Sequence, residues 1–298
     1  MKEISLKCCA KINLSLNIAG AVNGYHMLDT LAASVSPFEG YPVVGRDDHG
    51  APQAGWFDEI IIKKRADKKI NLICNIDIPG NNVIIAAEKF INKYGCAGAD
   101  IILNKNIPIS GGLGGSSADI ALIIKGLSML HGIKDDIELC NELGSDCAYM
   151  LHGGFARLKG KGDIIEKLDF YHEFKVLIVK PPYGITAREC FKAYDENPDA
   201  PRNDTQKCIN ALKNNNLNEF YANMYNALEA PALKIKPSLD GVRRRLESLN
   251  PNAVLMSGSG SCMFALFDAN AETPPFNDLF KDEKVFVCKT VKEGMLIN

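Results

Sequence analysis

The sequence predicts an α+β fold in two domains. The chain has 298 residues, and at roughly 150 residues per domain two domains are expected. Strand-like and helix-like segments are mixed along it without strict β-α alternation, which is typical of α+β proteins. An apolar strand pattern at residues 174–180 ends in two prolines and follows a hairpin-like stretch. We therefore expect the boundary near residue 168, between domains of residues 1–168 and 169–298.

The N-terminal half opens with strand patterns. Apolar and polar residues alternate over residues 4–18, which predicts a half-buried strand that is long enough to bend or be interrupted. A turn at Asn23 and Gly24 separates it from a second strand at 27–35. Residues 36–56 include seven glycines or prolines and predict a long irregular loop, which a further strand at 59–63 follows.

Helical periodicity and short apolar runs predict the elements that follow. Residues 81–94 carry apolar side chains at helical spacing, and 101–103 form a short strand. Apolar positions 120, 123, 124, 127 and 130 mark one face of the next helix. The remaining predicted elements are a helix at 136–143, another from about 145 to Gly153, a hairpin over 155–168, helices around 187–195, 205–213, 217–228 and 237–248, and strands at 253–256, 262–267 and 285–288.

Composition and charge exclude several classes of protein. The net charge is −2, so no global charge attracts nucleic acid or an anionic membrane. No apolar run approaches the roughly 18 residues that span a bilayer, and the first residues run directly into a strand pattern without the apolar segment of a signal peptide. We expect a cytoplasmic protein whose partner is a small molecule, and its oligomeric state is left open.

The ten cysteines do not follow a metal-binding pattern. No C-x-x-C pair occurs, and the five histidines do not cluster with cysteines at zinc spacings. Several cysteines stand among apolar residues, as buried free thiols do. We therefore expect reduced thiols and no metal bound by cysteine and histidine. The basic runs at 63–65 and 243–245 are short, and we interpret them as solvated faces.

A glycine-rich segment between a predicted strand and a predicted helix carries the strongest functional signal. It consists of Pro108, Ile109, Ser110, Gly111, Gly112, Leu113, Gly114, Gly115, Ser116, Ser117 and Ala118. Its four glycines let the backbone take positive φ angles and approach a ligand, and a helix that begins at the two serines directs its N–H groups and dipole at an anion. The spacing is neither that of a Walker A loop nor that of a dinucleotide fingerprint. We favour a nucleotide-phosphate site; the alternative is a tight turn with a serine N-cap.

Three other features are ambiguous when taken singly. The loop at residues 257–261 fits a plain turn as well as a ligand contact. Lys11, on the polar face of the first strand, would ordinarily face solvent. Asp146 would ordinarily be a carboxylate at a helix N-terminus.

Taken together and in this order, five segments resemble the GHMP small-molecule kinases. They are residues 10–14 (A-K-I-N-L), 24–26 (G-Y-H), the glycine loop 108–118, 143–146 (L-G-S-D) and 256–260 (M-S-G-S-G). The first, second and fourth narrow the resemblance to members that phosphorylate the 2-hydroxyl of a cytidine-diphosphate-linked polyol in non-mevalonate isoprenoid (terpenoid) biosynthesis. The resemblance implies ATP and Mg²⁺ as cofactors. It also implies an N-terminal domain of the ribosomal-protein-S5 type and a C-terminal ferredoxin-like domain, with the site between them.

The same resemblance implies roles on the nucleotide side of the site. Asp146 would be the catalytic carboxylate and Lys11 its partner at the substrate hydroxyl. Residues 108–118 would wrap the ATP phosphates, with Lys105 and Asn82 near the nucleotide. Ser117 alone would contact the Mg²⁺ that ATP carries, because Ser116 and Ala118 stand where the family pattern has glycine and a second serine.

On the acceptor side, the resemblance implies five substrate-binding residues. They are Asn13, Tyr25, His26, Thr186 and Phe191. All except Thr186 would meet the cytidine end, with Tyr25 and Phe191 on the two faces of the base and His26 at its edge. The loop at 38–56 is about twenty residues longer than the equivalent turn of the family, which would reshape the mouth of this region.

These residue types suit phosphoryl transfer to an alcohol. A carboxylate takes the hydroxyl proton, a neighbouring ammonium stabilises both groups, and the glycine loop with Mg²⁺ positions the phosphates. Other GHMP kinases, acting on mevalonate-type alcohols, homoserine or sugars, remain an alternative, as does a non-catalytic ATP-binding sensor. The G-Y-H segment favours a pyrimidine-bearing acceptor over the first alternative. The presence of both Lys11 and Asp146 argues against the second.

Overall fold

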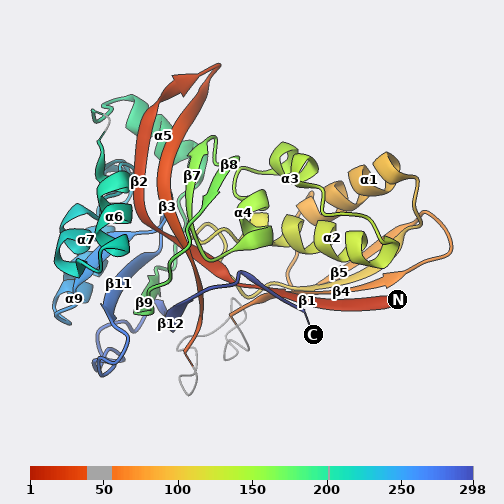
Figure 1. Ribbon diagram of the computed structural model, residues 1–298. Helices are drawn as coiled ribbons and strands as arrows, with labels where there is room; N and C mark the ends of the chain where they lie inside the picture. Colours follow the sequence, from red (N-terminus) through yellow and green to blue (C-terminus); the bar gives the residue numbers. More distant parts are fainter. Residues whose placement is uncertain (39–55, 201, 298) are drawn as a thin grey trace.

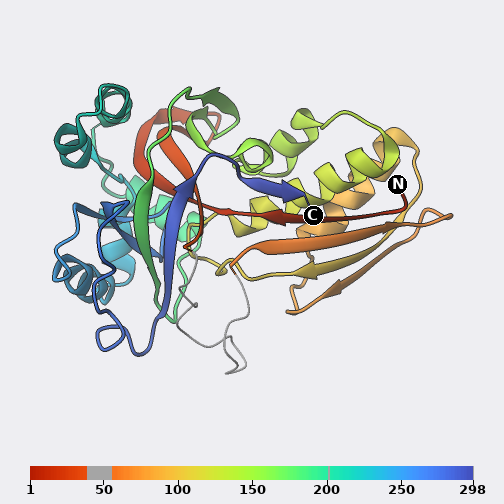
Figure 2. The same ribbon diagram turned by 60° about the horizontal axis from the view of Figure 1, so that its bottom comes forward.

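The computed structural model describes residues 1–38, 56–200 and 202–297, and two β-sheets organise them (Figure 1). The first sheet has five strands in the order β13-β1-β4-β6-β5. Their bounds are β1 Glu3–Cys8, β4 Asp58–Lys64, β5 Ile70–Cys74, β6 Ala99–Asn104 and β13 Met295–Ile297. Figure 2 shows this sheet extended beneath the helices that cover one of its faces.

The helices on this side of the sheet pack against it or against one another. They are α1 Asn82–Tyr94, α2 Gly115–His131, α3 Ile137–Leu143 and α4 Cys147–His152. The side chain of Asn81 caps α1 by accepting a hydrogen bond from the backbone N–H of Val83 (3.0 Å), and Asp136 caps α3 in the same way from Leu139 (3.0 Å). These helices confirm the predictions for residues 81–94 and 136–143.

The second sheet has eight strands and joins both halves of the chain. Its order is β10-β11-β9-β12-β3-β7-β8, with β2 also paired to β3. The bounds are β2 Ala10–Val22, β3 Tyr25–Pro37, β7 Phe155–Gly160, β8 Ile164–Lys167, β9 Phe174–Lys180, β10 Ala253–Met256, β11 Met263–Asp268 and β12 Lys284–Val291. Strands from both sides of residue 168 share this sheet. The two sheets and the helices that cover them confirm the α+β class, whereas the boundary at 168 stays a prediction.

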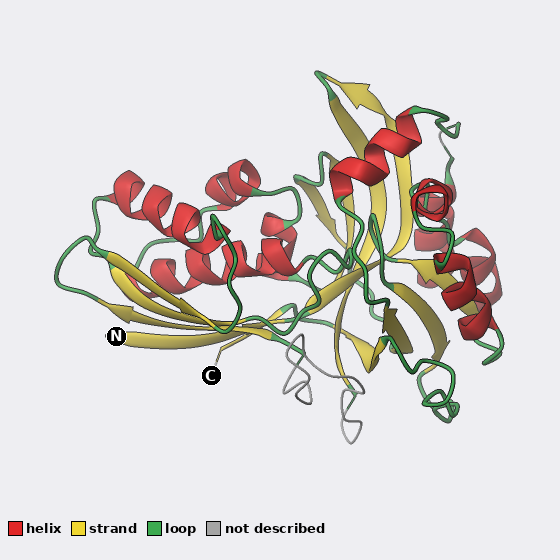
Figure 3. Ribbon diagram, turned by 180° about the vertical axis from the view of Figure 1, so that it is seen from behind, coloured by secondary structure: helices red, strands yellow, loops and turns green. Residues whose placement is uncertain are grey.

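The helices of the C-terminal half pack around this second sheet, as Figure 3 shows from behind. They are α5 Ala187–Asp195, α6 Asp204–Lys213, α7 Leu217–Asn223, α8 Glu229–Ile235 and α9 Leu239–Glu247. The single helix predicted over 217–228 is wrong, because α7 ends at Asn223. Beyond it the chain turns to β2, where Leu16 exchanges backbone hydrogen bonds with Tyr225 (2.7 Å) and Ala227 (2.9 Å).

Other differences from the sequence predictions occur at strands. The alternating segment is interrupted at Cys9, as expected, but its polar face from Lys11 to Asn17 is buried rather than half-exposed, because α6 and the glycine loop cover it. Strands β5 and β13 were not predicted. Most of the loop predicted at 36–56 lies outside the described residues; Ser36 and Pro37 belong to β3.

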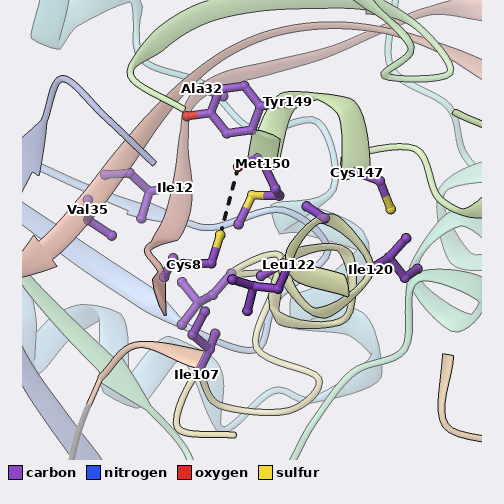
Figure 4. Close-up of a cluster of buried hydrophobic side chains, with 14 of the residues drawn as sticks. Cys8, Ile12, Ala32, Val35, Ile107, Ile120, Leu122, Cys147, Tyr149 and Met150 are labelled. Atoms are coloured by element: carbon purple, nitrogen blue, oxygen red, sulfur yellow. Dashed lines mark hydrogen bonds between the residues drawn. The ribbon is translucent and has the colours of Figure 1, made fainter. Parts of the chain in front are cut away.

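The main core lies where β1, β2 and β3 meet α2 and α4 (Figure 4). Ile12 and Leu122 are completely buried there, and the Cys8 thiol reaches the backbone oxygen of Met150 at 3.9 Å. A second apolar cluster lies between the other face of the eight-stranded sheet and α5, α8 and α9. In the described part of the chain, no helix is both long and apolar enough to cross a membrane.

Candidate active site

The glycine loop runs from the end of β6 into the first turn of α2. Gly112 and Gly114 have φ angles of 75° and 80°, a region that glycine occupies at little cost, and Ser110 has a φ angle of 50°. The N-cap of α2 is Gly114, and no side chain caps the helix. The alternative of a turn with a serine N-cap is therefore wrong. The uncapped N–H groups of the first turn lie at the positive end of the helix dipole, an arrangement suited to phosphate.

A cavity of about 490 Å³ opens against this loop, a volume within the range of small-ligand sites. Of the eleven loop residues, all but the buried Ala118 line it. The other lining residues are Ile78, Pro79, Gly80, Asn81, Asn82, Lys105, Ile107, Asp119, Ile185, Thr186, Ala187, Ser259 and Gly260. Asn82 donates a hydrogen bond to Ser116 (2.8 Å), which ties α1 to the loop.

Thr186, whose role at the acceptor stays a prediction, lies at the cavity of the glycine loop. It caps α5 in a reciprocal capping box with Glu189 and lines the cavity of the glycine loop. The beginning of α5 therefore contributes to the wall of this cavity, as the beginning of α1 does. Sequence spacing alone could not have revealed this, because 68 positions separate Thr186 from Ala118.

Lys11 and Asp146, which are far apart in the sequence, meet beside the loop. The Lys11 ammonium lies 3.2 Å from Asp146 and 2.7 Å from the side-chain oxygen of Asn13. Lys11 is only 5% exposed, so the expectation of a solvent-facing lysine is wrong. Its backbone N–H donates to Leu113 (3.0 Å), and its side chain packs directly under Gly114. The geometry thus brings an ammonium and a carboxylate together at the inner edge of the glycine loop.

Asn13 is oriented from behind rather than presented to solvent. It is buried, accepts from Lys11 and donates to the hydroxyl of Thr30 at 2.8 Å. Thr30 in turn donates to the backbone oxygen of Ser15. This chain of hydrogen bonds fixes the lysine, and it makes Asn13 a support for Lys11 in this structure.

A buried group of three charges holds both ends of the loop. The Lys105 ammonium lies 2.7 Å from Asp58 and 2.6 Å from Asp119. The second oxygen of Asp58 accepts backbone N–H bonds from Asn106 (2.7 Å) and Ile107 (2.9 Å), just before the loop begins. Asp119 stands in α2, just after the loop ends. Lys105 lines the cavity, but its ammonium is bound by carboxylates of the protein itself, and its place near the nucleotide stays a prediction.

The electrostatics of this group are strongly perturbed. Burial and the negative charge of Asp58 raise the pKa of Asp119 to about 8. Although burial disfavours the charged form of Lys105, its two carboxylate partners raise its pKa. One oxygen of Asp119 is buried without a hydrogen-bond partner. Asp58 was not singled out in the sequence, where a lone carboxylate at the start of a strand gives no signal.

The loop at residues 257–261 supports the glycine loop. The Ser257 hydroxyl donates to the backbone oxygen of Gly112 (2.9 Å), and the Ser261 N–H donates to Ser110 (3.2 Å). Behind it, the Asn226 amide donates to the backbone oxygens of Met256 and Gly258, both at 2.8 Å. The loop is therefore more than a plain turn. A direct ligand contact through Ser259 or Gly260, which line the cavity, stays a prediction.

Two of the residues expected at the acceptor base, His26 and Phe191, meet between the tip of the β2–β3 hairpin and α5. The His26 ring stacks on Phe191, with centroids 4.6 Å apart and planes inclined by 20°. Its Nε2 atom lies 2.7 Å from Asp195. Tyr25 is exposed at the hairpin tip, with the Lys161 ammonium 5.1 Å from its ring centroid. The expected arrangement, with a base between Tyr25 and Phe191, thus differs here, because the imidazole occupies one face of Phe191.

Comparisons with known proteins agree over the whole chain. The family description "GHMP kinases N terminal domain" matches residues 81–155, and "GHMP kinases C terminal" matches 208–273. A putative 4-diphosphocytidyl-2-C-methyl-D-erythritol kinase from Streptococcus uberis is 32% identical, with 98% of each chain covered. The 4-diphosphocytidyl-2-C-methyl-D-erythritol kinase of Clostridium kluyveri is 30% identical, with 96% of this chain and 99% of the relative covered.

Solved structures share the architecture. A 4-(cytidine 5'-diphospho)-2C-methyl-D-erythritol kinase superposes with a TM-score of 0.75 at 25% identity, over 96% of this chain and 98% of the other. A homoserine kinase from Cytophaga hutchinsonii superposes with a TM-score of 0.72 at 16% identity, over 100% and 98%. At that identity the second likeness concerns the fold alone.

Proposed function

Because this chain belongs to the GHMP kinase family of ATP-dependent kinases, we propose that it phosphorylates a hydroxyl of 4-diphosphocytidyl-2-C-methyl-D-erythritol in isoprenoid biosynthesis. The observation that carries this proposal is the contact between Lys11 and Asp146 at 3.2 Å beside the glycine-loop cavity. A carboxylate and an ammonium at this position can act on a hydroxyl group that faces the terminal phosphate of ATP.

In the proposed reaction, Asp146 accepts the proton of the acceptor hydroxyl as the oxygen attacks the γ-phosphorus. Asp146 is partly exposed, so the acceptor can reach it, whereas Lys11 is buried and held by Asn13. The Lys11 ammonium stabilises the carboxylate before transfer and the negative charge that develops on the oxygen during it. The N–H groups of the glycine loop and of the first turn of α2 hold the phosphates in line.

The residues around the cavity fit Mg²⁺ carried by ATP. Mg²⁺ is usually bound by phosphate oxygens together with a few protein oxygens and water. Ser117 and Asp119 both line the cavity, and one carboxylate oxygen of Asp119 is buried without a hydrogen-bond partner. Ser117 would therefore hold the ion, which supplies neutralisation of phosphate charge when it is bound.

Two observations support the cytidine-bearing acceptor over other alcohols. The rings of His26 and Phe191 stack on one another beside the tip of the β2–β3 hairpin, where Tyr25 is exposed, and aromatic faces suit a flat base better than mevalonate or homoserine. The relatives with about 30% identity carry the name of the cytidine-bearing acceptor. The fold itself does not discriminate, since homoserine kinase shares it.

The proposal is tested by ADP release with ATP, Mg²⁺ and a panel of acceptors. The panel contains 4-diphosphocytidyl-2-C-methyl-D-erythritol, mevalonate, homoserine and galactose. We expect the kcat/KM of the cytidine-bearing acceptor to exceed that of every other acceptor by at least about 10³-fold, because buried polar groups left unpaired discriminate strongly. A higher kcat/KM for another alcohol would replace the proposed substrate. ATP binding without turnover of any acceptor would favour the sensor alternative.

A further inference from the structure

The β2–β3 hairpin projects away from its sheet, and α5 lies alongside its tip (Figures 1 and 3). Within the described residues, the contacts recorded between the two elements centre on His26. Its ring stacks on Phe191, meets the edge of Tyr194 at 6.0 Å between centroids, and has Nε2 2.7 Å from an oxygen of Asp195. Thus three residues of the last two turns of α5 hold one imidazole.

We infer that Asp195 is a positioning residue for recognition of the acceptor base, acting through His26; this inference rests on the proposed function. A carboxylate can only accept a hydrogen bond, so Asp195 selects the imidazole tautomer that carries its proton on Nε2, and in that tautomer the lone pair lies on Nδ1. A lone pair there accepts a hydrogen bond from the exocyclic amine of cytosine. Uracil presents a carbonyl oxygen at the same position, and that oxygen repels the lone pair on Nδ1. Asp195 therefore sets the polarity of the nitrogen that meets the base.

A purely structural role of the pair explains the geometry less well. The Asp195 side chain is 60% exposed, and a polar contact so exposed to water adds little to folding stability. The ring contacts with Phe191 and Tyr194 already hold the imidazole in place without the carboxylate. What the carboxylate adds is the choice of which nitrogen carries the proton.

The test measures binding of CDP and UDP to the full chain by isothermal titration calorimetry. Saturating AMP-PNP occupies the glycine-loop cavity, so that the nucleoside diphosphates report on the acceptor site. Wild type should bind CDP more tightly than UDP. Asp195→Ala should weaken CDP binding about tenfold and bring the ratio of the two affinities close to one, because the imidazole then adopts either tautomer. Its Tm should stay within about 2 °C of wild type.

Two further variants separate positioning from charge. In Asp195→Asn the amide oxygen still accepts the Nε2 proton, so much of the preference for CDP should return. Glu196→Ala removes a neighbouring exposed carboxylate at the same helix end and should leave both affinities unchanged. An unchanged CDP-to-UDP ratio in Asp195→Ala overturns the positioning role alone. Failure of the wild-type protein to bind CDP at all overturns the proposed acceptor, and the inference with it.

Discussion

Replacement of Lys105 by methionine tests whether the buried charges hold the glycine loop. The change leaves the carboxylates of Asp58 and Asp119 facing one another in a site where all three side chains are at most 5% exposed. Loss of one partner from a buried ionic group costs about 3–5 kcal/mol. Since Asp119 can take up a proton, the lower end applies, and we expect Lys105→Met to lose about 3 kcal/mol. For a chain of this size that corresponds to a fall in Tm of roughly 6–12 °C.

Urea denaturation and thermal unfolding of three variants measure this effect. Lys105→Met combined with Asp119→Asn should recover about 1–2 kcal/mol relative to Lys105→Met alone, because only one uncompensated carboxylate then remains. As a matched control, Lys125→Met breaks the partly exposed pair with Asp135 (2.7 Å) and should cost at most about 1 kcal/mol.

The same variant distinguishes this explanation from a role of Lys105 at the nucleotide, as its position near the loop suggested. If Lys105 only contacts ATP, its replacement should raise the KM for ATP and leave the free energy of unfolding unchanged. Wild-type stability of Lys105→Met, together with a raised KM for ATP, would therefore refute the argument from the buried group.

Three further predictions follow from the pKa of Asp119, the catalytic pair and the loop contacts. The pKa of Asp119, raised to about 8, lies above its value of about 4 in an unfolded chain, so stability present at acid pH is lost as the pH rises through about 8. Thermal unfolding at about pH 6.5 and pH 8.5 should show this fall in wild type and a smaller one in Asp119→Asn, and equal slopes would contradict it. Lys11→Ala should lower kcat by roughly 10²-fold or more, because it removes the ammonium beside Asp146. The control Lys7→Ala removes only a partly exposed ion pair with Glu59 and should leave kcat unchanged. Equal losses of kcat in the two variants would mean that the wrong lysine is assigned. Gly112→Ala should lower the free energy of unfolding by about 1–3 kcal/mol and raise the KM for ATP, because the added methyl group would collide with a backbone oxygen of the facing loop. The control Gly132→Ala, also at positive φ but in open space, should leave the KM for ATP unchanged. An unchanged KM in both variants would argue against the loop contact.

Patterns of local sequence were sufficient for most of the fold. The helix α1 has both an apolar stripe and an asparagine cap, and β9 is a mostly apolar strand that two prolines follow. Segments whose structure depends on distant partners were not predictable in this way. Strand β5 pairs in parallel with β6, and β13 is a short strand that pairs with β1. The chain after Asn223 leaves helical geometry because it bonds to β2.

At the candidate site, the sequence predicted the glycine loop from its own composition, but the meeting of Lys11 and Asp146 only through resemblance. Alternation along β2 placed Lys11 on a polar face, and only tertiary packing turns that face into a buried one. Asp58 and Asp195 were missed because a single carboxylate has no signature until its partner is known. The long polar face of β2 was a signal in the sequence, because polar residues that continue along a buried strand indicate a functional site.

In the proposed mechanism, Asp146 acts on the acceptor hydroxyl while the glycine loop holds ATP independently. Asp146→Asn keeps the size of the side chain at the N-cap of α4 and removes only its charge and basicity. We expect kcat for ADP release with 4-diphosphocytidyl-2-C-methyl-D-erythritol to fall by roughly 10²–10⁴-fold, while the Kd for ATP changes by less than about threefold. A kcat within about threefold of wild type would contradict the assignment of Asp146, and with it the proposed mechanism.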